Sequence, residues 1–379
     1  MQIYIYLKHF SPNGSELNEG TSKAVHGLAS GLVACGVDVV ILCEGAQEDD
    51  LCTTKAGYQI ASFVSESSKP SFKLSIGLKQ YISSISSSEQ NLFILNGIFH
   101  LSVYALSRFL KQQSLQYIVA PHDPYHPTIF RKNAHLKWVY WYLLERNLLR
   151  QAYAVQVLDK RHSEWLRRLG IEIPVVEVPN GFSQDDVVLE STLNWSTEPV
   201  PKLLFLGRLD AYNKGLDILL NAFGQFTQLS EGKLTIQGPD WGDRHALEEQ
   251  AKHLNLTSKV TFLEPDYNVS PSSIIAKYDI FCITSRFEGF SLSALEAMLA
   301  GRVLLISEIA GIAPHIKASG CGVVVHPEPT AIKAGLLELL EKRSQWQEMG
   351  LRGRQYVLDN LHWNAIASRA LKDYKILMT

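Results

Sequence analysis

Short apolar runs alternate with segments of helical spacing along the chain. In the first half, apolar runs at 2–7, 37–43, 91–99 and 116–121 predict strands, and the spacing of apolar residues predicts helices at 21–35 and near 101–113. A strand followed by a helix, repeated in this way, is typical of a parallel, doubly wound sheet. We therefore predict an α/β fold for this half.

The alternation pauses at 178–202, where turn residues, acidic residues and prolines with little periodicity indicate a linker region. It then resumes with predicted strands at 202–209, 233–238, 259–265, 279–285, 302–308 and 321–327, and helices near 215–229 and 244–254. The last segment, 361–379, again has helical spacing. We predict two Rossmann-like domains, 1–183 and 184–360, that face each other across a cleft. Ligands of such sheets bind outside the carboxyl ends of the strands, so the residues that follow each strand are the candidates for function.

Composition changes this prediction little. A chain of 379 residues exceeds what one hydrophobic core usually absorbs, and a net charge of -2 gives no electrostatic case for nucleic-acid binding. The five cysteines are scattered without a CxxC pair, which favours a reducing compartment and argues against a disulfide framework or a zinc site. The first apolar run is too short for a signal peptide, and no run is long enough to span a membrane. We expect a cytoplasmic protein.

One segment keeps a peripheral membrane contact open. The stretch "HLKWVYWYLLERNLLRQ" mixes basic and aromatic residues, with its aromatic part at 136–144. An interfacial helix has this composition, and so does a helix that is partly buried in a core. Both interpretations stand at this point.

Two cations follow the predicted strand that ends at Gly207. Arg208 comes directly after this glycine, and Lys214 lies six positions later, just before a predicted helix that opens near Gly215. Cations beside a helix N-terminus suit a diphosphate, because they add charge-assisted hydrogen bonds to the free amides and the helix dipole. The alternative is a solvated loop with two basic residues.

Two glutamates enclose the stretch "FEGFSLSALEAMLAGR". Glu288 follows a predicted strand, and Gly289, Phe290, Ser291 and Leu292 lead from it into a helix that carries Glu296. Backbone amides at such a helix start can bind a phosphate, and Gly289 permits a close approach. Ser293 with Glu296 also fits a capping box, which would explain Glu296 but not Glu288.

Two weaker candidates lie in the first half. His122, in "PHD", follows the strand predicted at 116–121, although a lone histidine is more often structural. Gly20 stands just before the first predicted helix and would allow a phosphate or sugar to come close. The loop before Gly20 lacks G-x-G-x-x-G, which makes a nicotinamide oxidoreductase the weakest alternative.

Together these motifs resemble the retaining, GT-B-fold glycosyltransferases of family 4, also called glycosyl transferases group 1. "FLGRLDAYNKGLDILLNAF" is similar to the family's G-R-x(n)-K-G-x-D-x-L-x-x-A stretch, and "EGFSLSALEAMLAGRVLLISEIAG" is similar to its E-x7-E block. "PHD" and "VPNGF" in the first half agree more loosely. The chain departs from the family pattern at Ser291, where glycine is commoner, and at Pro314, where a glutamate often stands.

The resemblance implies a role for each candidate. Arg208 and Lys214 would hold the donor diphosphate, Glu296 would bind the ribose, and Glu288 with the amides of 290–292 would hold the donor sugar and the distal phosphate. His122 would contact the donor sugar. The remaining donor-binding positions would be glycines: Gly20, Gly207, Gly238 and Gly289. The C-terminal helix at 361–379 would pack back on the first domain.

The expected activity is transfer of a hexose from a UDP- or GDP-linked donor to an acceptor hydroxyl, in cell-envelope or extracellular polysaccharide or glycolipid assembly. The acceptor would be a saccharide or a lipid-linked saccharide. No DxD triplet follows a strand end, and the acidic loops at 48–50 and 184–186 are expected to be solvated, so we expect neither a metal nor another cofactor. A nucleotide-sugar epimerase, a phosphorylase and a non-enzymatic sugar-nucleotide binder remain open as alternatives.

Overall fold

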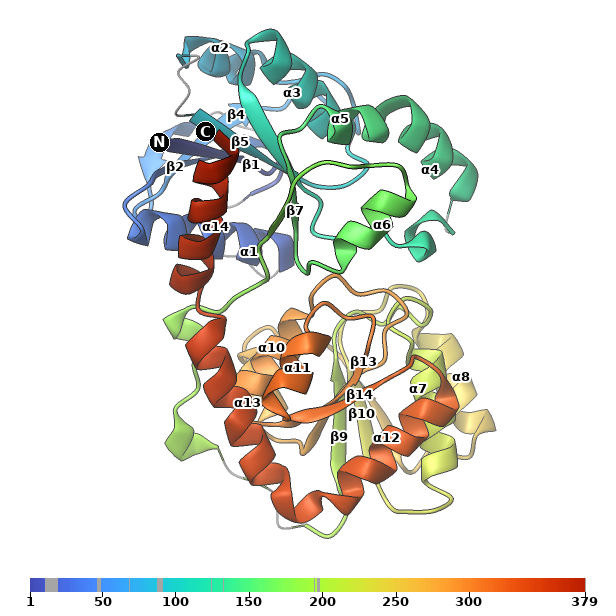
Figure 1. Ribbon diagram of the computed structural model, residues 1–379. Helices are drawn as coiled ribbons and strands as arrows, with labels where there is room; N and C mark the ends of the chain where they lie inside the picture. Colours follow the sequence, from blue (N-terminus) through green and yellow to red (C-terminus); the bar gives the residue numbers. More distant parts are fainter. Residues whose placement is uncertain are drawn as a thin grey trace. The chain divides into compact units, whose positions relative to one another are not determined.

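The computed structural model describes residues 1–10, 20–45, 49–67, 69–86, 91–123, 125–131, 133–193, 195 and 198–378. The chain forms two compact units, shown in Figure 1. Unit 1 consists of Met1–Gly181 together with Trp363–Thr379, and unit 2 consists of Phe182–His362. The acidic loop predicted at 48–50 begins outside the described residues, and 184–186 forms the short 3-10 helix η3 (Gln184–Asp186).

Unit 1 is built on an eight-stranded sheet with the order β3-β4-β2-β1-β5-β6-β7-β8. Its strands are β1 (Gln2–Tyr6), β2 (Asp38–Gly45), β3 (Asp49–Thr53), β4 (Gln59–Val64), β5 (Asn91–Asn96), β6 (Gln116–Ala120), β7 (Val155–Val157) and β8 (Val175–Glu177). Its helices are α1 (Gly20–Ala34), α2 (Ile76–Ser84), α3 (Leu101–Gln112), η1 (Pro127–Phe130), α4 (Ala134–Tyr140), η2 (Trp141–Glu145, a π-helix), α5 (Arg146–Arg150), α6 (His162–Arg168) and α14 (Trp363–Met378).

The strands of unit 1 form because their runs are apolar on both faces, as a covered parallel sheet requires. The four residues 3–6 of β1 are all buried, for example, and one large core lies against α2, α3 and α5. The C-terminal helix α14 packs on α1, where a Cβ at Gly27 would lie 2.0 Å from the Trp363 ring. The hydroxyl of Tyr374 donates to Gln156 Oε1 at 2.6 Å, so the last helix is also hydrogen-bonded to β7.

Unit 2 has a six-stranded sheet with the order β11-β10-β9-β12-β13-β14, and its neighbouring strands are parallel. The strands are β9 (Lys202–Leu206), β10 (Lys233–Gln237), β11 (Val260–Leu263), β12 (Ile280–Ile283), β13 (Val303–Ser307) and β14 (Gly322–Val325). The helices are η3, η4 (Glu190–Thr192), α7 (Leu216–Phe226), α8 (Arg244–His253), α9 (Pro271–Ile275), α10 (Leu292–Leu299), α11 (Ala313–Ser319), α12 (Pro329–Glu341), η5 (Arg343–Gln345) and α13 (Trp346–Asn360). In Figure 1, α7, α8 and α12 lie on one side of this sheet and α10, α11 and α13 on the other.

The prediction of doubly wound α/β sheets is confirmed for both units, with one correction. Edge strand β3 pairs with β4 antiparallel, with a register shift between Asp49 and Cys52, so the sheet of unit 1 is mixed. Among the described residues, no helix has the length and apolar character needed to cross a membrane.

Candidate active site

Strand order reverses in unit 2 between β9 and β12, and two loops leave the sheet at this point. After β9, the chain adds β10 and β11 on one side of this strand, and it then adds β12, β13 and β14 on the other side. The loop after β9 carries Gly207, Arg208 and Lys214, and the loop after β12 carries Glu288 and Gly289. The carboxyl ends of parallel strands at such a switch point are where open α/β sheets bind ligands. The structure therefore brings these predicted residues to one edge of unit 2.

Backbone contacts hold the two loops together. Gly215, the residue before α7, has φ 66°, and a Cβ there would lie 2.1 Å from the carbonyl oxygen of Thr284. The Thr284 hydroxyl donates to the carbonyl of Gly215 at 3.0 Å, and the amide of Arg286 donates to the carbonyl of Asn213 at 2.9 Å. Only glycine fits at position 215, because the start of α7 lies directly against the end of β12.

Lys214 and Glu288 form an ion pair across these loops. Lys214 Nζ lies 2.7 Å from Glu288 Oε2, with side-chain exposures of 19% and 11%. The Ser285 hydroxyl donates to the same carboxylate oxygen at 3.2 Å. An ammonium has three N–H donors, and Glu288 is the one partner found for Lys214 Nζ among the described residues, which leaves two donors for a ligand. The carboxylate thus fixes the position of the cation at the start of α7.

Arg208 is exposed, and its guanidinium lies over an aromatic ring. Its guanidinium carbon is 4.3 Å from the ring centroid of Trp241, which follows β10. This cation–π contact orients the guanidinium without using its hydrogen-bond donors. Nothing in the apolar periodicity of the sequence indicates Trp241, because it lies in a turn beyond the strand.

Gly207 and Gly238 meet where β9 and β10 end. A Cβ at Gly238 would lie 1.9 Å from the carbonyl oxygen of Gly207, and the amide of Gly207 donates to the carbonyl of Gln237 at 3.0 Å. The two glycines allow the backbones of adjacent strands to approach more closely than side chains would permit.

Helix α10 begins one residue after its cap, Ser291. The Ser291 hydroxyl accepts from the amide of Ala294 at 3.2 Å and also lies 3.1 Å from the hydroxyl of Ser293. The capping box at Ser293 is therefore wrong, since Ser293 is the second residue inside the helix. Glu296 lies in the second turn and is 8% exposed, so capping does not explain it.

The other residues of the segment that enters α10 are held in place. The carbonyl of Gly289 accepts from the amide of Gly311 at 3.1 Å. Phe290 is buried and packs edge-on against His315 with ring centroids 5.8 Å apart. Leu292 is the first residue of α10, so the chain from Glu288 to this residue forms the entry to the helix N-terminus.

His122 and Gly20 belong to unit 1. His122 lies just beyond β6 with φ 63°, and its Nε2 is 2.7 Å from Oδ1 of Asn96, the last residue of β5. Burial lowers the pKa of His122 to about 4, so the ring is neutral at physiological pH. Gly20 is the exposed first residue of α1, and the loop residues 11–19 before it lie outside the described part of the chain.

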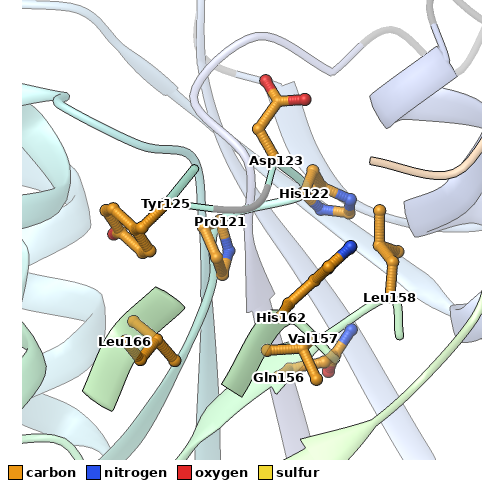
Figure 2. Close-up of a pocket in the computed structure, with 9 residues that line it drawn as sticks. All are labelled: Pro121, His122, Asp123, Tyr125, Gln156, Val157, Leu158, His162 and Leu166. Carbon is orange, nitrogen blue, oxygen red and sulfur yellow. The ribbon is translucent and has the colours of Figure 1, made fainter. Parts of the chain in front are cut away.

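Figure 2 shows a small pocket in unit 1 beside His122. It contains His162, the first residue of α6, which the sequence did not single out. Asn96, the partner of His122, was also not predicted as a site residue. It follows the apolar residues 92–95 and is itself a buried polar side chain at the end of the strand, and this is the signal that could have found it.

Over the described ranges, no group of three or more His, Cys, Asp and Glu side chains is placed to hold a metal ion.

Comparison with known proteins decides the family. Residues 194–356 match the family model described as "Glycosyl transferases group 1", and residues 19–181 match that of the "Glycosyl transferase 4-like domain". The chain belongs to the GT-B glycosyltransferases of family 4. Each match covers most of one unit, and together they contain all the candidate residues named above.

Curated relatives agree over part of their length. An uncharacterized glycosyltransferase of Methanocaldococcus jannaschii is 31% identical over 178 residues, which are 46% of this chain and 45% of the relative. A phosphatidyl-myo-inositol mannosyltransferase of Mycobacterium tuberculosis is 26% identical over 207 residues, 53% of each chain. The chain thus spans about half the length of the curated relatives it matches.

Solved structures match over the full length. Sucrose-phosphate synthase from Thermosynechococcus elongatus aligns with a TM-score of 0.77 at 20% identity, over 100% of this chain and 99% of that one. HepE of Anabaena, solved in complex with UDP and glucose, aligns with a TM-score of 0.73 at 15% identity, over 99% and 100% of the two chains. At these identities the likeness shows the fold, which is GT-B.

Proposed function

We propose that this protein transfers a hexosyl group from a UDP- or GDP-linked donor to a hydroxyl of a saccharide or lipid-linked saccharide, with retained anomeric configuration and without a metal. The observation that carries the proposal is the Lys214–Glu288 pair at the switch point of unit 2, between the starts of α7 and α10. Family membership supports the nucleotide-sugar donor.

The electrostatics of this site suit a departing nucleoside diphosphate. Cleavage of the glycosidic bond places negative charge on the diphosphate and positive charge on the sugar. Arg208 and the two remaining N–H donors of Lys214 would stabilise the negative charge on the diphosphate, together with the amides at the helix starts. Because these groups are already in place, no rearrangement cost falls on the reaction step. Two cations on the leaving group replace the charge that a metal ion would supply.

The other candidates keep the roles that the family resemblance gives them. Glu288 would orient both Lys214 and the donor sugar, and Glu296 would accept from the ribose hydroxyls. His122 would contact the donor sugar, and Gly20 would leave room for the phosphate. In retaining enzymes of this type the leaving phosphate is taken to receive the acceptor proton, so no nucleophilic carboxylate is assigned.

The test is an assay of UDP-glucose, UDP-galactose and GDP-mannose with a panel of saccharide and lipid-linked acceptors, with excess EDTA in a parallel series. The proposal expects nucleotide release that depends on acceptor, an unchanged rate in EDTA, and a product with the donor's anomeric configuration by NMR. Donor isomerisation or phosphorolysis without acceptor would instead indicate an epimerase or a phosphorylase. Binding without turnover of any donor would indicate a non-enzymatic binder.

We also propose that unit 1 contacts the inner, anionic membrane surface through residues 131–150. Large apolar side chains project into solvent here, although the same helical segment buries Trp141 and Leu148 on its other face. The exposed ones are Leu136 (62%), Trp138 (37%), Val139 (57%), Tyr142 (60%) and Leu143 (64%). The single acid in this segment, Glu145, is fully buried, while Arg131 and Arg150 are exposed. An apolar ridge with basic neighbours binds anionic lipid.

Vesicle co-sedimentation tests this contact. The triple variant Leu136→Ser, Val139→Ser, Leu143→Ser is compared with a control that removes three apolar residues elsewhere that are somewhat more exposed, Leu189→Ser, Leu229→Ser, Ile376→Ser. We expect wild type and control to sediment with phosphatidylglycerol-containing vesicles and the first variant to remain in the supernatant. Equal sedimentation of both variants would contradict the proposal.

A further inference from the structure

A pocket in unit 1 has room for one small polar group. It lies between the segment that begins at Pro121, the end of β7 near Gln156, and the first turns of α6 at His162 and Leu166 (Figure 2). Its cavity volume is about 10 Å³. This is about the space of one water molecule, so a hydroxyl fits and a sugar ring does not.

His162 brings an unused nitrogen to this pocket. The residue is 5% exposed, and its Nε2 is buried with no hydrogen-bond partner among the described residues. In Figure 2 the imidazole extends toward His122. Leaving a buried polar atom unpaired costs about 1–3 kcal/mol, so a bound group that pairs with Nε2 would supply a hydrogen bond that the described residues do not provide.

Asp159, whose charge acts on His162, does not serve as that partner. Asp159 is buried, and its two carboxylate oxygens accept from Arg161, from the backbone amide at 2.8 Å and from Nε at 2.7 Å. Burial lowers the pKa of His162 to about 4, against the opposing effect of Asp159. A neutral imidazole has one N–H donor and one acceptor nitrogen, which suits a hydroxyl better than an anion.

His122 is a second polar residue that lines the pocket, and its hydrogen bond to Asn96 fixes the tautomer of its ring. The amide nitrogen of Asn96 donates to the carbonyl of Tyr6 at 3.0 Å, so Asn96 Oδ1 is the atom that accepts from His122 Nε2. With its proton on Nε2, the neutral His122 ring has Nδ1 as an acceptor. A hydroxyl both donates and accepts, and it can therefore satisfy two histidines in one small space.

We infer that His162 is a specificity-determining residue that hydrogen-bonds one sugar hydroxyl of a substrate in this pocket. The inference deepens the proposed function and rests on it. The hydroxyl belongs either to the donor hexose or to the acceptor saccharide, and the two sources are distinguished by which Michaelis constant responds.

The kinetic test compares wild type with His162→Phe, which keeps a planar ring without nitrogen, and His162→Gln, which restores a donor and an acceptor. His253→Phe on the surface of α8 is the matched control. We expect His162→Phe to raise the KM of one substrate about tenfold with kcat changed less than about threefold, and His162→Gln to recover part of the loss. The deoxy analogue of that substrate that lacks the bound hydroxyl should show no difference between wild type and His162→Phe.

Two results would overturn the inference. If both KM values of His162→Phe equal those of wild type while its Tm falls, the pocket holds only a structural water. If His162→Phe raises the KM of every deoxy analogue by the same factor, then His162 supports the fold and does not bind a particular hydroxyl.

NMR of ¹⁵N-histidine-labelled wild type separates this inference from the proposed function and does not depend on turnover. Addition of UDP-glucose, GDP-mannose or methyl α-glucoside should shift the Nε2 signal of His162, which His162→Gln assigns by its loss. A shift without sugar transfer to any acceptor would support the pocket and refute the proposed function. If the enzyme transfers sugar but neither its donor nor its acceptor saccharide shifts the Nε2 signal of His162, the inference about this pocket is refuted and the proposed function stands.

Discussion

At the scale of single residues, the site depends on a few backbone approaches and one ion pair. Gly215 lets α7 start against Thr284, and this places Lys214 2.7 Å from Glu288. Sequence alone indicated these residue types because each follows a strand end. It could not indicate that the cation and the acid bond each other, because they are 74 positions apart. It also missed Trp241 in a turn and His162 at the start of a short helix, since a single aromatic or histidine side chain carries no periodic signal.

Glu288→Gln tests the role of that pair. The amide keeps the shape but removes the charge that holds Lys214, so kcat should fall about 100-fold, as for loss of one group that stabilises a transition state. Intact-protein mass spectrometry during turnover should show no glycosyl adduct in wild type or variant. Glu249→Gln on the surface of α8 serves as the control. A hexosyl adduct on wild type that Glu288→Gln abolishes would make Glu288 a nucleophile and refute this role.

Gly238→Ala tests the close approach of β9 and β10. Its Cβ would lie 1.9 Å from the carbonyl oxygen of Gly207, so the strands must separate, and we expect a loss of about 3 kcal/mol or more in the free energy of unfolding. Gly242→Ala is the matched control, because it has φ 98° but no atom within 4 Å of the added Cβ. It should cost about 1 kcal/mol from backbone strain alone. Equal denaturation midpoints for the two variants would contradict the steric explanation.

At the scale of elements, the apolar runs predicted the central strands well because parallel strands are buried on both faces. The run at 302–308 became β13, Val303–Ser307, with all its residues buried. The three-residue strands β7 and β8 were missed, since runs so short do not differ from loop sequence. The start of α10 was shifted because two serines, Ser291 and Ser293, both offer a cap and only the fold selects between them.

The sequence did not decide whether the helical segment 134–150 contacts a membrane or packs in the core, and the structure explains why. It buries Trp141, Glu145, Leu148 and Leu149 on one face while exposing apolar residues on another, so it has features of both. Burial raises the pKa of Glu145 to about 7, although Tyr125 donates to it at 2.6 Å and opposes the shift.

This carboxyl group predicts a pH dependence of stability. Because the folded pKa is raised from 4.5 to about 7, the native state binds a proton that the unfolded chain has released between these values. Stability from this group is therefore present at low pH and is lost as pH rises through about 7. Glu145→Gln should remove this slope and gain up to about 3 kcal/mol relative to wild type between pH 5 and pH 8. Thermal unfolding of wild type, Glu145→Gln and the exposed-site control Glu164→Gln at a series of pH values measures this dependence. If the stability of wild type and of Glu145→Gln changed with pH in the same way, the raised pKa of Glu145 would be contradicted.

At the scale of the whole molecule, the chain folds into two α/β units, and its last helix belongs with the first unit. The alternation of strands and helices predicted the fold class, and the E-x7-E block with Arg208 and Lys214 pointed to the family. What the sequence could not provide is the pairing of distant loops, because contacts such as that of Asn96 with His122 arise only when neighbouring strands are placed side by side.

The central claim is that the switch point of unit 2 binds a nucleoside diphosphate through Arg208 and Lys214. Isothermal titration of UDP and GDP, with uridine and guanosine as ligands that lack the diphosphate, tests it most directly on wild type, Arg208→Ala, Lys214→Ala and the surface control Lys252→Ala. We predict that each site variant weakens the binding of one of the two nucleoside diphosphates about 10- to 100-fold and leaves the weak binding of the nucleosides unchanged. Lys252→Ala should bind all four ligands as wild type does. An unchanged Kd for UDP and GDP in both site variants would contradict the account.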